Sequence, residues 1–224
     1  RHYTLEPRLD SGRLHHVQGE AASGDLEVLR PASDPFDTEG GLALLDGNLG
    51  RCVIKVSAVA PEHRVVEAPA RIFEDQVELK QAFERGELEQ DLVAVVRFQG
   101  PAANGMPELH KLTPYLGILQ DRGFKVALVT DGRMSGASGK VPAAIHLTPE
   151  ALAEGPIGKL RDGDLVRLDA NSGELNALVP TDEWTARRNT KRKTDTSAYG
   201  TGRELFTHMR RAVSDAESGA SVFS

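Results

Sequence analysis

A loop of small residues near the middle of the chain has the composition of a ligand-binding site. An apolar stretch at residues 125–129 predicts a buried strand, and the loop after it holds one bulky apolar side chain, Met134. Its glycines are Gly132, Gly136 and Gly139. Glycine lets the backbone approach a ligand closely and adopt a positive φ. The composition therefore predicts a binding loop, with an ordinary connection between strands as an equal interpretation.

Other residues of this loop carry polar groups. Asp131 lies at the end of the predicted strand, so it is either a catalytic carboxylate or the acidic residue of a turn. Gly139 and Lys140 invite comparison with the phosphate-binding P-loop, GxxxxGK[ST]. The comparison fails, because Met134 replaces the first glycine and Val141 replaces the Ser or Thr that binds Mg²⁺. Nucleotide hydrolysis is therefore not expected.

Length, charge and cysteine content exclude several classes of protein. The chain has 224 residues, 39% of them hydrophobic and 27% charged, as in a globular protein with a full core. A formal net charge of −6 argues against nucleic-acid binding, and no apolar run is long enough to span a membrane. The single cysteine, Cys52, cannot form an intrachain disulfide or hold a metal cluster alone, and its apolar neighbours predict a core residue. We expect a cytosolic protein.

Short apolar segments bounded by Gly, Pro or Asp predict a β-rich core. Eight strands are expected, at residues 42–45, 52–58, 64–73, 92–98, 125–130, 143–147, 165–169 and 174–179. Few helices lie between them. The pattern therefore favours a closed or sandwich-like β core with flanking helices over a doubly wound sheet.

Helical spacing of apolar residues occurs in three places. Residues 74–85 predict a helix that ends at Gly86, and residues 107–121 predict a helix that Pro114 bends or splits. Residues 203–213 predict a C-terminal helix.

These elements divide the chain into four parts. Residues 1–40 are an irregular lead-in with one or two short strands, and residues 41–180 form the β-rich core. Residues 181–199 are an exposed connection with a helix at its start and a solvated basic cluster at 187–193. Residues 200–224 hold the C-terminal helix and tail.

Several motifs together resemble one enzyme family. They are TDGRMSG at 130–136, HLTPEA at 146–151, QGPAANGMPELH at 99–110, GNLGR at 47–51, KVSA at 55–58, VEAP at 66–69 and GTGRELF at 200–206. They are similar to the C-terminal region of the dihydroxy-acid and sugar-acid dehydratases, over nearly the whole chain. The resemblance implies an α/β fold: a β-barrel-like swivelling β/β/α domain with flanking helices, similar to the mobile domain of aconitase.

The resemblance also implies a reaction. Members of the family remove water from their substrates with Mg²⁺ and an iron-sulfur cluster, whose cysteine ligands lie in an N-terminal domain. Nothing in this sequence matches that domain and the chain begins at Arg1. We therefore expect the C-terminal domain of a longer, homodimeric hydro-lyase, inactive by itself. Residues 103–111 and 136–140 resemble members that convert 6-phospho-D-gluconate to 2-dehydro-3-deoxy-6-phosphogluconate in the Entner-Doudoroff route.

Four residues of this sequence match positions with a role in that reaction or are suited to its substrate. Ser135 matches the serine that removes the proton, and Glu108 matches the carboxylate that the C-terminal domain contributes to Mg²⁺. Arg133 and Lys140 flank Ser135, and a phosphorylated substrate needs cationic partners.

Other interpretations stay open. His110 and His146 are either structural or orient a substrate hydroxyl. A dihydroxy acid or an unphosphorylated aldonic acid is the second candidate substrate. If the chain is complete as given, a non-catalytic module that binds a sugar phosphate or a protein is a further interpretation.

Overall fold

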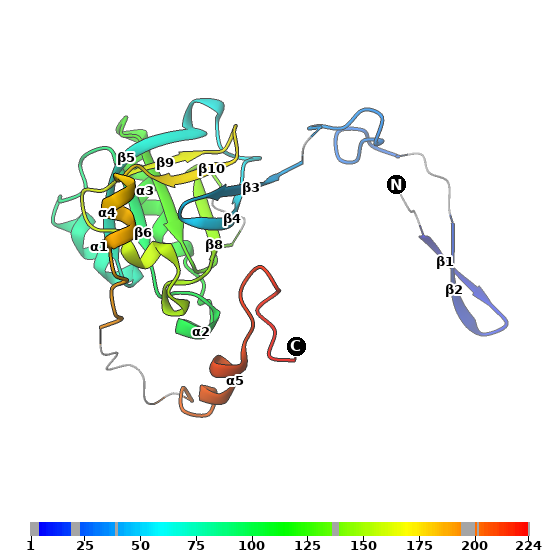
Figure 1. The fold of residues 1–224 in the computed structure, drawn as a ribbon. Helices are drawn as coiled ribbons and strands as arrows, with labels where there is room; N and C mark the ends of the chain where they lie inside the picture. Colours follow the sequence, from blue (N-terminus) through cyan, green and yellow to red (C-terminus); the bar gives the residue numbers. More distant parts are fainter. Residues whose placement is uncertain are drawn as a thin grey trace. The chain divides into compact units, whose positions relative to one another are not determined.

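A computed structural model describes residues 5–18, 23–38, 40–135, 139–193, 200 and 202–223 (Figure 1). The chain divides into two compact units, Arg1–Gly40 and Gly41–Ser224. Each unit is described below by itself.

The first unit contains a β-hairpin. Its strands, β1 (Leu5–Asp10) and β2 (Arg13–Gln18), pair antiparallel. Ser11 and Gly12 connect them with positive φ angles of 50° and 76°, the backbone that matches the twist of a two-residue hairpin. The lead-in therefore contains two short strands, within the range that its sequence suggests.

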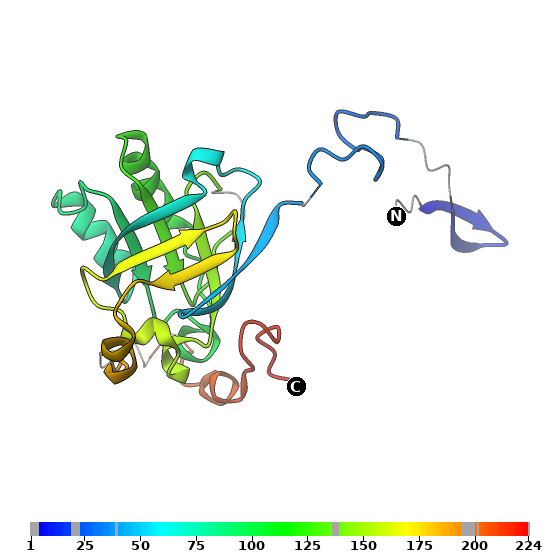
Figure 2. The ribbon, with the colours of Figure 1, turned by 45° about the horizontal axis from the view of Figure 1, so that its top comes forward.

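The second unit is built on a closed barrel (Figure 2). The strands are β3 (Leu42–Gly47), β4 (Gly50–Lys55), β5 (Val65–Phe73), β6 (Leu92–Val96), β7 (Val126–Thr130), β8 (Ala143–Thr148), β9 (Leu165–Asp169) and β10 (Glu174–Ala177). Around the barrel they follow the order β10-β3-β4-β8-β7-β6-β5-β9. All eight predicted strands are confirmed, and of the two predicted architectures the closed one is correct.

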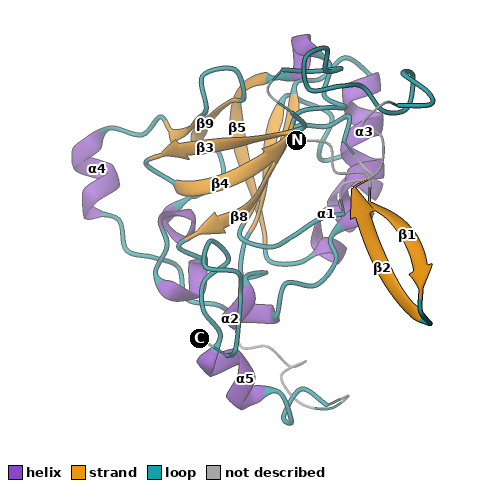
Figure 3. Ribbon diagram, turned by 90° about the vertical axis from the view of Figure 1, so that its right-hand side faces the viewer, coloured by secondary structure: helices purple, strands orange, loops and turns teal. Residues whose placement is uncertain are grey.

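Four neighbouring strands, β5 to β8, run parallel. Every residue of β6 and β7 is buried, because one face of these strands points into the barrel and helices cover the other. The covering helices are α1 (Gln76–Glu84) and α3 (Thr113–Asp121), as Figure 3 shows. This double burial explains why both strands read as continuous apolar runs.

The helix predicted at 74–85 is confirmed as α1. Asp75 caps it, since its carboxylate accepts hydrogen bonds from the amides of Val77 and Glu78. Gly86 follows its end with φ at 72°, the left-handed conformation that glycine adopts without strain.

The helix predicted at 107–121 is wrong at its start. A 3₁₀ turn, η2 (His110–Leu112), precedes α3, which begins at Thr113. Pro114 therefore lies in the first turn of α3, where a proline removes no helical hydrogen bond. Glu108 is not helical, because it forms a parallel β-bridge with Arg133.

The remaining helical elements are short. They are η1 (Pro61–His63), α2 (Pro101–Asn104), η3 (Ala151–Ala153), η4 (Pro156–Lys159), α4 (Thr181–Ala186) and α5 (Thr207–Ala212). The C-terminal helix predicted at 203–213 is shorter than expected, because turns occupy residues 202–206. Across the described ranges, no helix has the length and apolar character needed to cross a bilayer.

Two predictions about single side chains have different outcomes. Cys52 is a core residue as predicted, and burial together with the charge of Asp46 raises the pKa of its thiol to about 12. Arg187, in the basic cluster predicted to be solvated, has a side chain only 6% exposed. It is ion-paired with Asp164 and Glu183, so the solvated interpretation is wrong for this residue.

Gly50 is a constrained position at the end of the β3-β4 turn, and its replacement tests the barrel. Its φ is 116°, and a Cβ there would overlap the carbonyl oxygen of Thr148 on β8. Gly50→Ala is therefore expected to lower the free energy of unfolding in urea by about 3 kcal/mol. Gly163 also has a positive φ, 88°, but open space around it, so Gly163→Ala should cost only about 1 kcal/mol. Equal losses would contradict the close approach of β4 and β8.

Candidate active site

The predicted site residues lie in loops at one end of the barrel. Strands β6, β7 and β8 are parallel, so the loops that follow them gather at their carboxyl ends. Glu108 is on the loop after β6, and Arg133 and Ser135 are on the loop after β7. The fold thus brings the two main motifs of the sequence together.

Asp131 fixes these loops to one another. Its side chain is 0% exposed. One carboxylate oxygen accepts from the amide of Gln99 at 2.8 Å, and the other accepts from Phe98 at 3.1 Å and Ala151 at 2.9 Å. Burial raises the pKa of Asp131, and the amide donors oppose that rise by favouring the carboxylate. Asp131 therefore joins the segments after β6, β7 and β8, and is too deeply buried here to contact a substrate.

Glu108 connects the loop after β6 to the loop after β7. Its Oε2 accepts from Nη1 of Arg133 at 2.8 Å, and its Oε1 accepts from the amide of Ser135 at 2.6 Å. Arg133 also donates from Nε to the carbonyl of Met106 at 2.8 Å. Because the Glu108 side chain is 29% exposed, its carboxylate is both held and accessible.

Ser135 is exposed at the edge of a small apolar pocket. The pocket has a volume of about 210 Å³ and is lined by Leu42, Val53, Lys55, Met134, Ser135, Gly139, Val141, Ala143, Ile145 and His146. A carboxylate next to Ser135 disfavours an alkoxide at Oγ through like-charge repulsion. Glu108 therefore has to be neutralised, by Arg133 or by a metal cation, before Ser135 can act as a base.

His146 lines the same pocket. It has a positive φ of 59°, unusual for a residue with a side chain, at a register shift between β4 and β8. Burial and the nearby charge of Arg133 lower its pKa. A neutral imidazole beside Ser135 can accept a hydrogen bond from a substrate hydroxyl, which is one of the two interpretations of His146.

The other predicted polar residues lie at the margins of the site. His110 has a side chain 57% exposed, with Nδ1 3.9 Å from Oε1 of Glu108. Lys140 contacts Asp121 of α3, with 2.6 Å from Nζ to each carboxylate oxygen. Lys140 therefore has to leave this ion pair in order to bind a phosphate. Three residues of the glycine-rich loop, 136–138, lie outside the described residues.

The donor groups fit one of the two implied cofactors. Cys52 is enclosed in the barrel core and its thiol does not ionise readily, so it does not fit a cluster. The accessible carboxylate of Glu108 is a suitable ligand for a hard cation such as Mg²⁺. In the part of the chain that the structure describes, no three His, Cys, Asp or Glu side chains gather as a metal site.

A row of apolar side chains on the outside of the barrel extends from this pocket. Leu44 pairs with Val53, and Val53 pairs with Ile145, so the three lie side by side across β3, β4 and β8. Leu42 and Leu44 are 66% and 60% exposed. Exposed apolar rows of this kind mark surfaces that another protein segment covers. The sequence signal for it was the apolar run at 42–45, which has leucine on both faces of β3.

A second buried carboxylate near Asp131 predicts how stability depends on pH. Burial, and then the charge of Asp131, raise the pKa of Glu150 to about 7, and its Oε2 accepts from the amide of Ala102. Because this pKa is raised, Glu150 contributes fully to the free energy of unfolding below pH 4.5, the ordinary pKa of a glutamate. That contribution is lost as the pH rises toward 7. The free energy of unfolding of Glu150→Gln should therefore rise by about 2 kcal/mol relative to that of wild type between about pH 5 and about pH 8.

Urea unfolding at several pH values measures this difference. Glu174→Gln is the matched control, because Glu174 is an exposed carboxylate on β10. Parallel stability curves for wild type and Glu150→Gln would contradict the prediction.

Comparison with known proteins places these features in a family. The family model described as dihydroxy-acid/6-phosphogluconate dehydratase C-terminal matches residues 27–220. Phosphogluconate dehydratases of Pseudomonas aeruginosa and Zymomonas mobilis are 66% and 60% identical, over 100% and 97% of this chain. A dihydroxy-acid dehydratase of Nitratidesulfovibrio vulgaris is 43% identical over 73% of the chain and 30% of its own length. The chain spans 36% of the length of the two phosphogluconate dehydratases. It belongs to the dihydroxy-acid/6-phosphogluconate dehydratase family, as a C-terminal domain.

Proposed function

We propose that this chain is the C-terminal domain of a 6-phosphogluconate dehydratase, which converts 6-phospho-D-gluconate to 2-dehydro-3-deoxy-6-phosphogluconate and water. The observation that carries the proposal is the contact of Glu108 with Arg133 and with the amide of Ser135. It joins a carboxylate suited to Mg²⁺ and a cation to Ser135, which lines the pocket. Phosphogluconate dehydratases are also more similar to the chain than the dihydroxy-acid dehydratase above.

Dehydration of a sugar acid requires a base at the carbon beside the carboxylate and stabilisation of the negative charge that results. Ser135 is the proposed base, which removes the proton from C2 of the substrate while hydroxide leaves from C3. Arg133 supplies positive charge within reach of Glu108 and of the pocket that His146 lines. Positive charge there stabilises both the alkoxide of Ser135 and the enolate-like intermediate.

Glu108 is the proposed ligand of this domain to Mg²⁺. Its two oxygens accept from Arg133 and from Ser135, and the same carboxylate would hold the cation. Bound Mg²⁺ and an iron-sulfur cluster would supply Lewis-acid chemistry for the carboxylate and the departing hydroxyl. Since this chain has one cysteine, which is buried, the cluster ligands belong to the N-terminal part of the longer enzyme.

The apolar row of β3, β4 and β8 is the surface on which that N-terminal part closes. It adjoins the pocket of Ser135, so closure would exclude water from the reacting atoms. In this respect the barrel acts as a swivelling domain similar to the mobile domain of aconitase. The complete enzyme is proposed to be a cytoplasmic homodimer without nucleic-acid or membrane partners.

The second candidate is a dehydratase of a dihydroxy acid or an unphosphorylated aldonic acid. The identity of 43% to a dihydroxy-acid dehydratase supports it. A chain that is complete without an N-terminal domain would instead be a non-catalytic sugar-phosphate-binding module. Turnover assays with 6-phosphogluconate, gluconate and a dihydroxy acid distinguish these three cases.

Replacement of the proposed base tests the mechanism. Ser135→Ala in the full-length enzyme is expected to lower kcat for 6-phosphogluconate by about a thousandfold, because proton transfer then lacks its acceptor. Iron content and substrate affinity should be unchanged. Ser172→Ala, in the exposed turn between β9 and β10, is the matched control. Near-normal turnover by Ser135→Ala would exclude Ser135 as the base.

Replacement of the flanking cations tests the phosphorylated substrate. Arg133→Gln and Lys140→Gln are each expected to raise KM for 6-phosphogluconate about tenfold, since a cation that binds the phosphate is lost. KM for gluconate should change much less. Lys125→Gln is the control, because Lys125 is also exposed. Equal effects on both substrates would remove Arg133 and Lys140 from phosphate recognition.

A further inference from the structure

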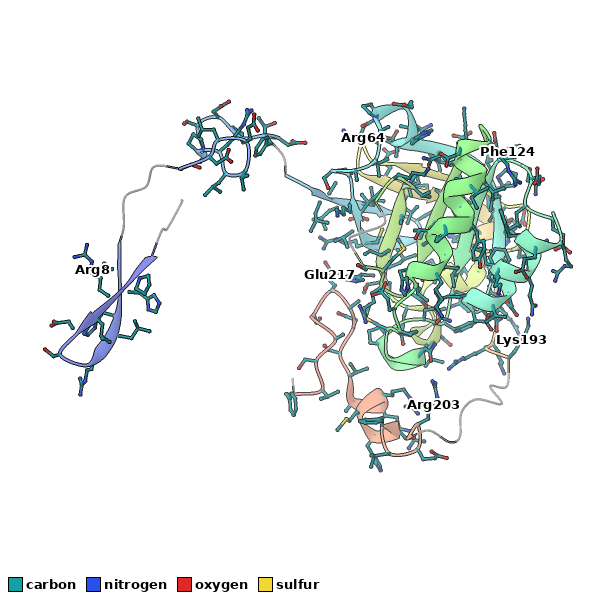
Figure 4. The ribbon with its side chains drawn as sticks, turned by 180° about the vertical axis from the view of Figure 1, so that it is seen from behind. Arg8, Arg64, Phe124, Lys193, Arg203 and Glu217 are labelled. Atoms are coloured by element: carbon teal, nitrogen blue, oxygen red, sulfur yellow. The ribbon has the colours of Figure 1, made fainter. Side chains whose placement is uncertain are left out.

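An arginine of the C-terminal segment contacts the loop that bears Glu108. Arg203 donates from both Nη1 and Nη2 to Oδ1 of Asn104, at 3.1 Å each. Asn104 is the last residue of α2, and a single short turn separates it from Glu108. Figure 4 marks Arg203 on the C-terminal segment. Two motifs far apart in the sequence, at 99–110 and 200–206, are therefore joined by one side-chain pair.

Asn104 also belongs to a buried chain of hydrogen bonds. Its Nδ2 donates to Oε1 of Gln99 at 2.9 Å. Gln99 is 3% exposed. Its side-chain Nε2 donates to the carbonyl of Glu74, and its backbone N–H donates to the carboxylate of Asp131. These partners fix the orientation of the Asn104 amide, because its nitrogen is committed to Gln99. Its oxygen therefore faces Arg203, and loss of the guanidinium would leave that oxygen without these two donors.

The turn between Asn104 and Glu108 needs such support. Gly105 has φ at 70° and Met106 has φ at 51°, an uncommon conformation for a residue with a side chain. Such backbone persists only when its surroundings hold it. On one side, Nε of Arg133 holds the carbonyl of Met106. On the other side, Arg203 holds Asn104.

One further contact attaches the C-terminal segment to the barrel, and another attaches the connection at 181–199 that precedes it. In that connection, Arg192 donates from Nη1 to the carbonyl of Ala103 in α2 at 2.6 Å. Glu217, labelled in Figure 4, forms an ion pair with Arg51 of β4 at 2.8 Å. The segment is thus attached both to the short helix before the site and to a barrel strand.

We propose that Arg203 is a positioning residue, which holds Asn104 and through it sets the position of Glu108 relative to Ser135. The inference rests on the proposed function, because it assigns Arg203 a part in the reaction through Glu108. Arg203 itself need not contact the substrate. Its loss loosens the turn at residues 104–108 and weakens the hold of Glu108 on the amide of Ser135.

Amide hydrogen exchange of the intact protein tests this role. In Arg203→Gln, exchange at Gly105, Leu109 and Ser135 is expected to rise about tenfold. These amides border or face the turn: Gly105 donates to the carbonyls of Gly100 and Pro101, Leu109 to the carbonyl of Arg133, and Ser135 to Glu108. Arg203→Lys, which keeps the charge and one donor, should give a smaller rise. Arg211→Gln is the matched control, because Arg211 is an exposed arginine of α5.

Kinetics separate positioning from a purely structural role. Arg203→Gln should lower kcat for 6-phosphogluconate about tenfold with KM changed by less than about twofold. Faster exchange confined to residues 200–223, or faster exchange at Gly105 and Ser135 without a fall in kcat, would overturn the proposal. Wild-type protein without dehydratase activity would refute the proposed function alone, and the exchange rates would still decide whether Arg203 holds the turn.

Discussion

Everything at the candidate site depends on the buried carboxylate of Asp131. Three parallel strands end beside one another, and the loops that follow them lie beyond the strand pairing, apart from the bridge between Glu108 and Arg133. Asp131 links these loops, because its two oxygens accept from the amides of Phe98, Gln99 and Ala151. Burial of a carboxylate that accepts from several amide donors costs much less free energy than burial of an unpaired carboxylate. The same group also raises the pKa of Glu150 and so links the site to the stability of the fold.

Glu108, Arg133 and Ser135 lie on the loops that Asp131 joins, and fewer hydrogen bonds connect them to one another. Glu108 is the only described residue that contacts both Arg133 and Ser135 through hydrogen bonds of its side chain. Its side chain is partly exposed, and so is the apolar pocket beside Ser135. Asp131 is buried, whereas Glu108 and Ser135 are accessible. This arrangement suits the proposed closure of the domain on another part of the enzyme.

The barrel could be predicted from the sequence because each strand is a short apolar run bounded by turn residues, a local signal. The helix at 107–121 was misplaced because Glu108 is extended by its bridge to Arg133, a contact between distant residues. Arg187 was expected in solvent, since its partner Asp164 cannot be identified from sequence spacing. Ser135 and Glu108 were proposed from motifs and Arg133 from its place beside Ser135, whereas the strained backbone of His146 follows from a register shift between β4 and β8.

Proton removal from C2 of 6-phosphogluconate by Ser135, as proposed above, can be measured as the release of deuterium from that carbon. The full-length enzyme would be mixed with substrate deuterated at C2, and the appearance of deuterium in water would be followed by NMR. If Ser135 is the base, wild type releases deuterium and Ser135→Ala releases none above background, although the variant binds the substrate. Release by Ser135→Ala at the wild-type rate would show that another group is the base.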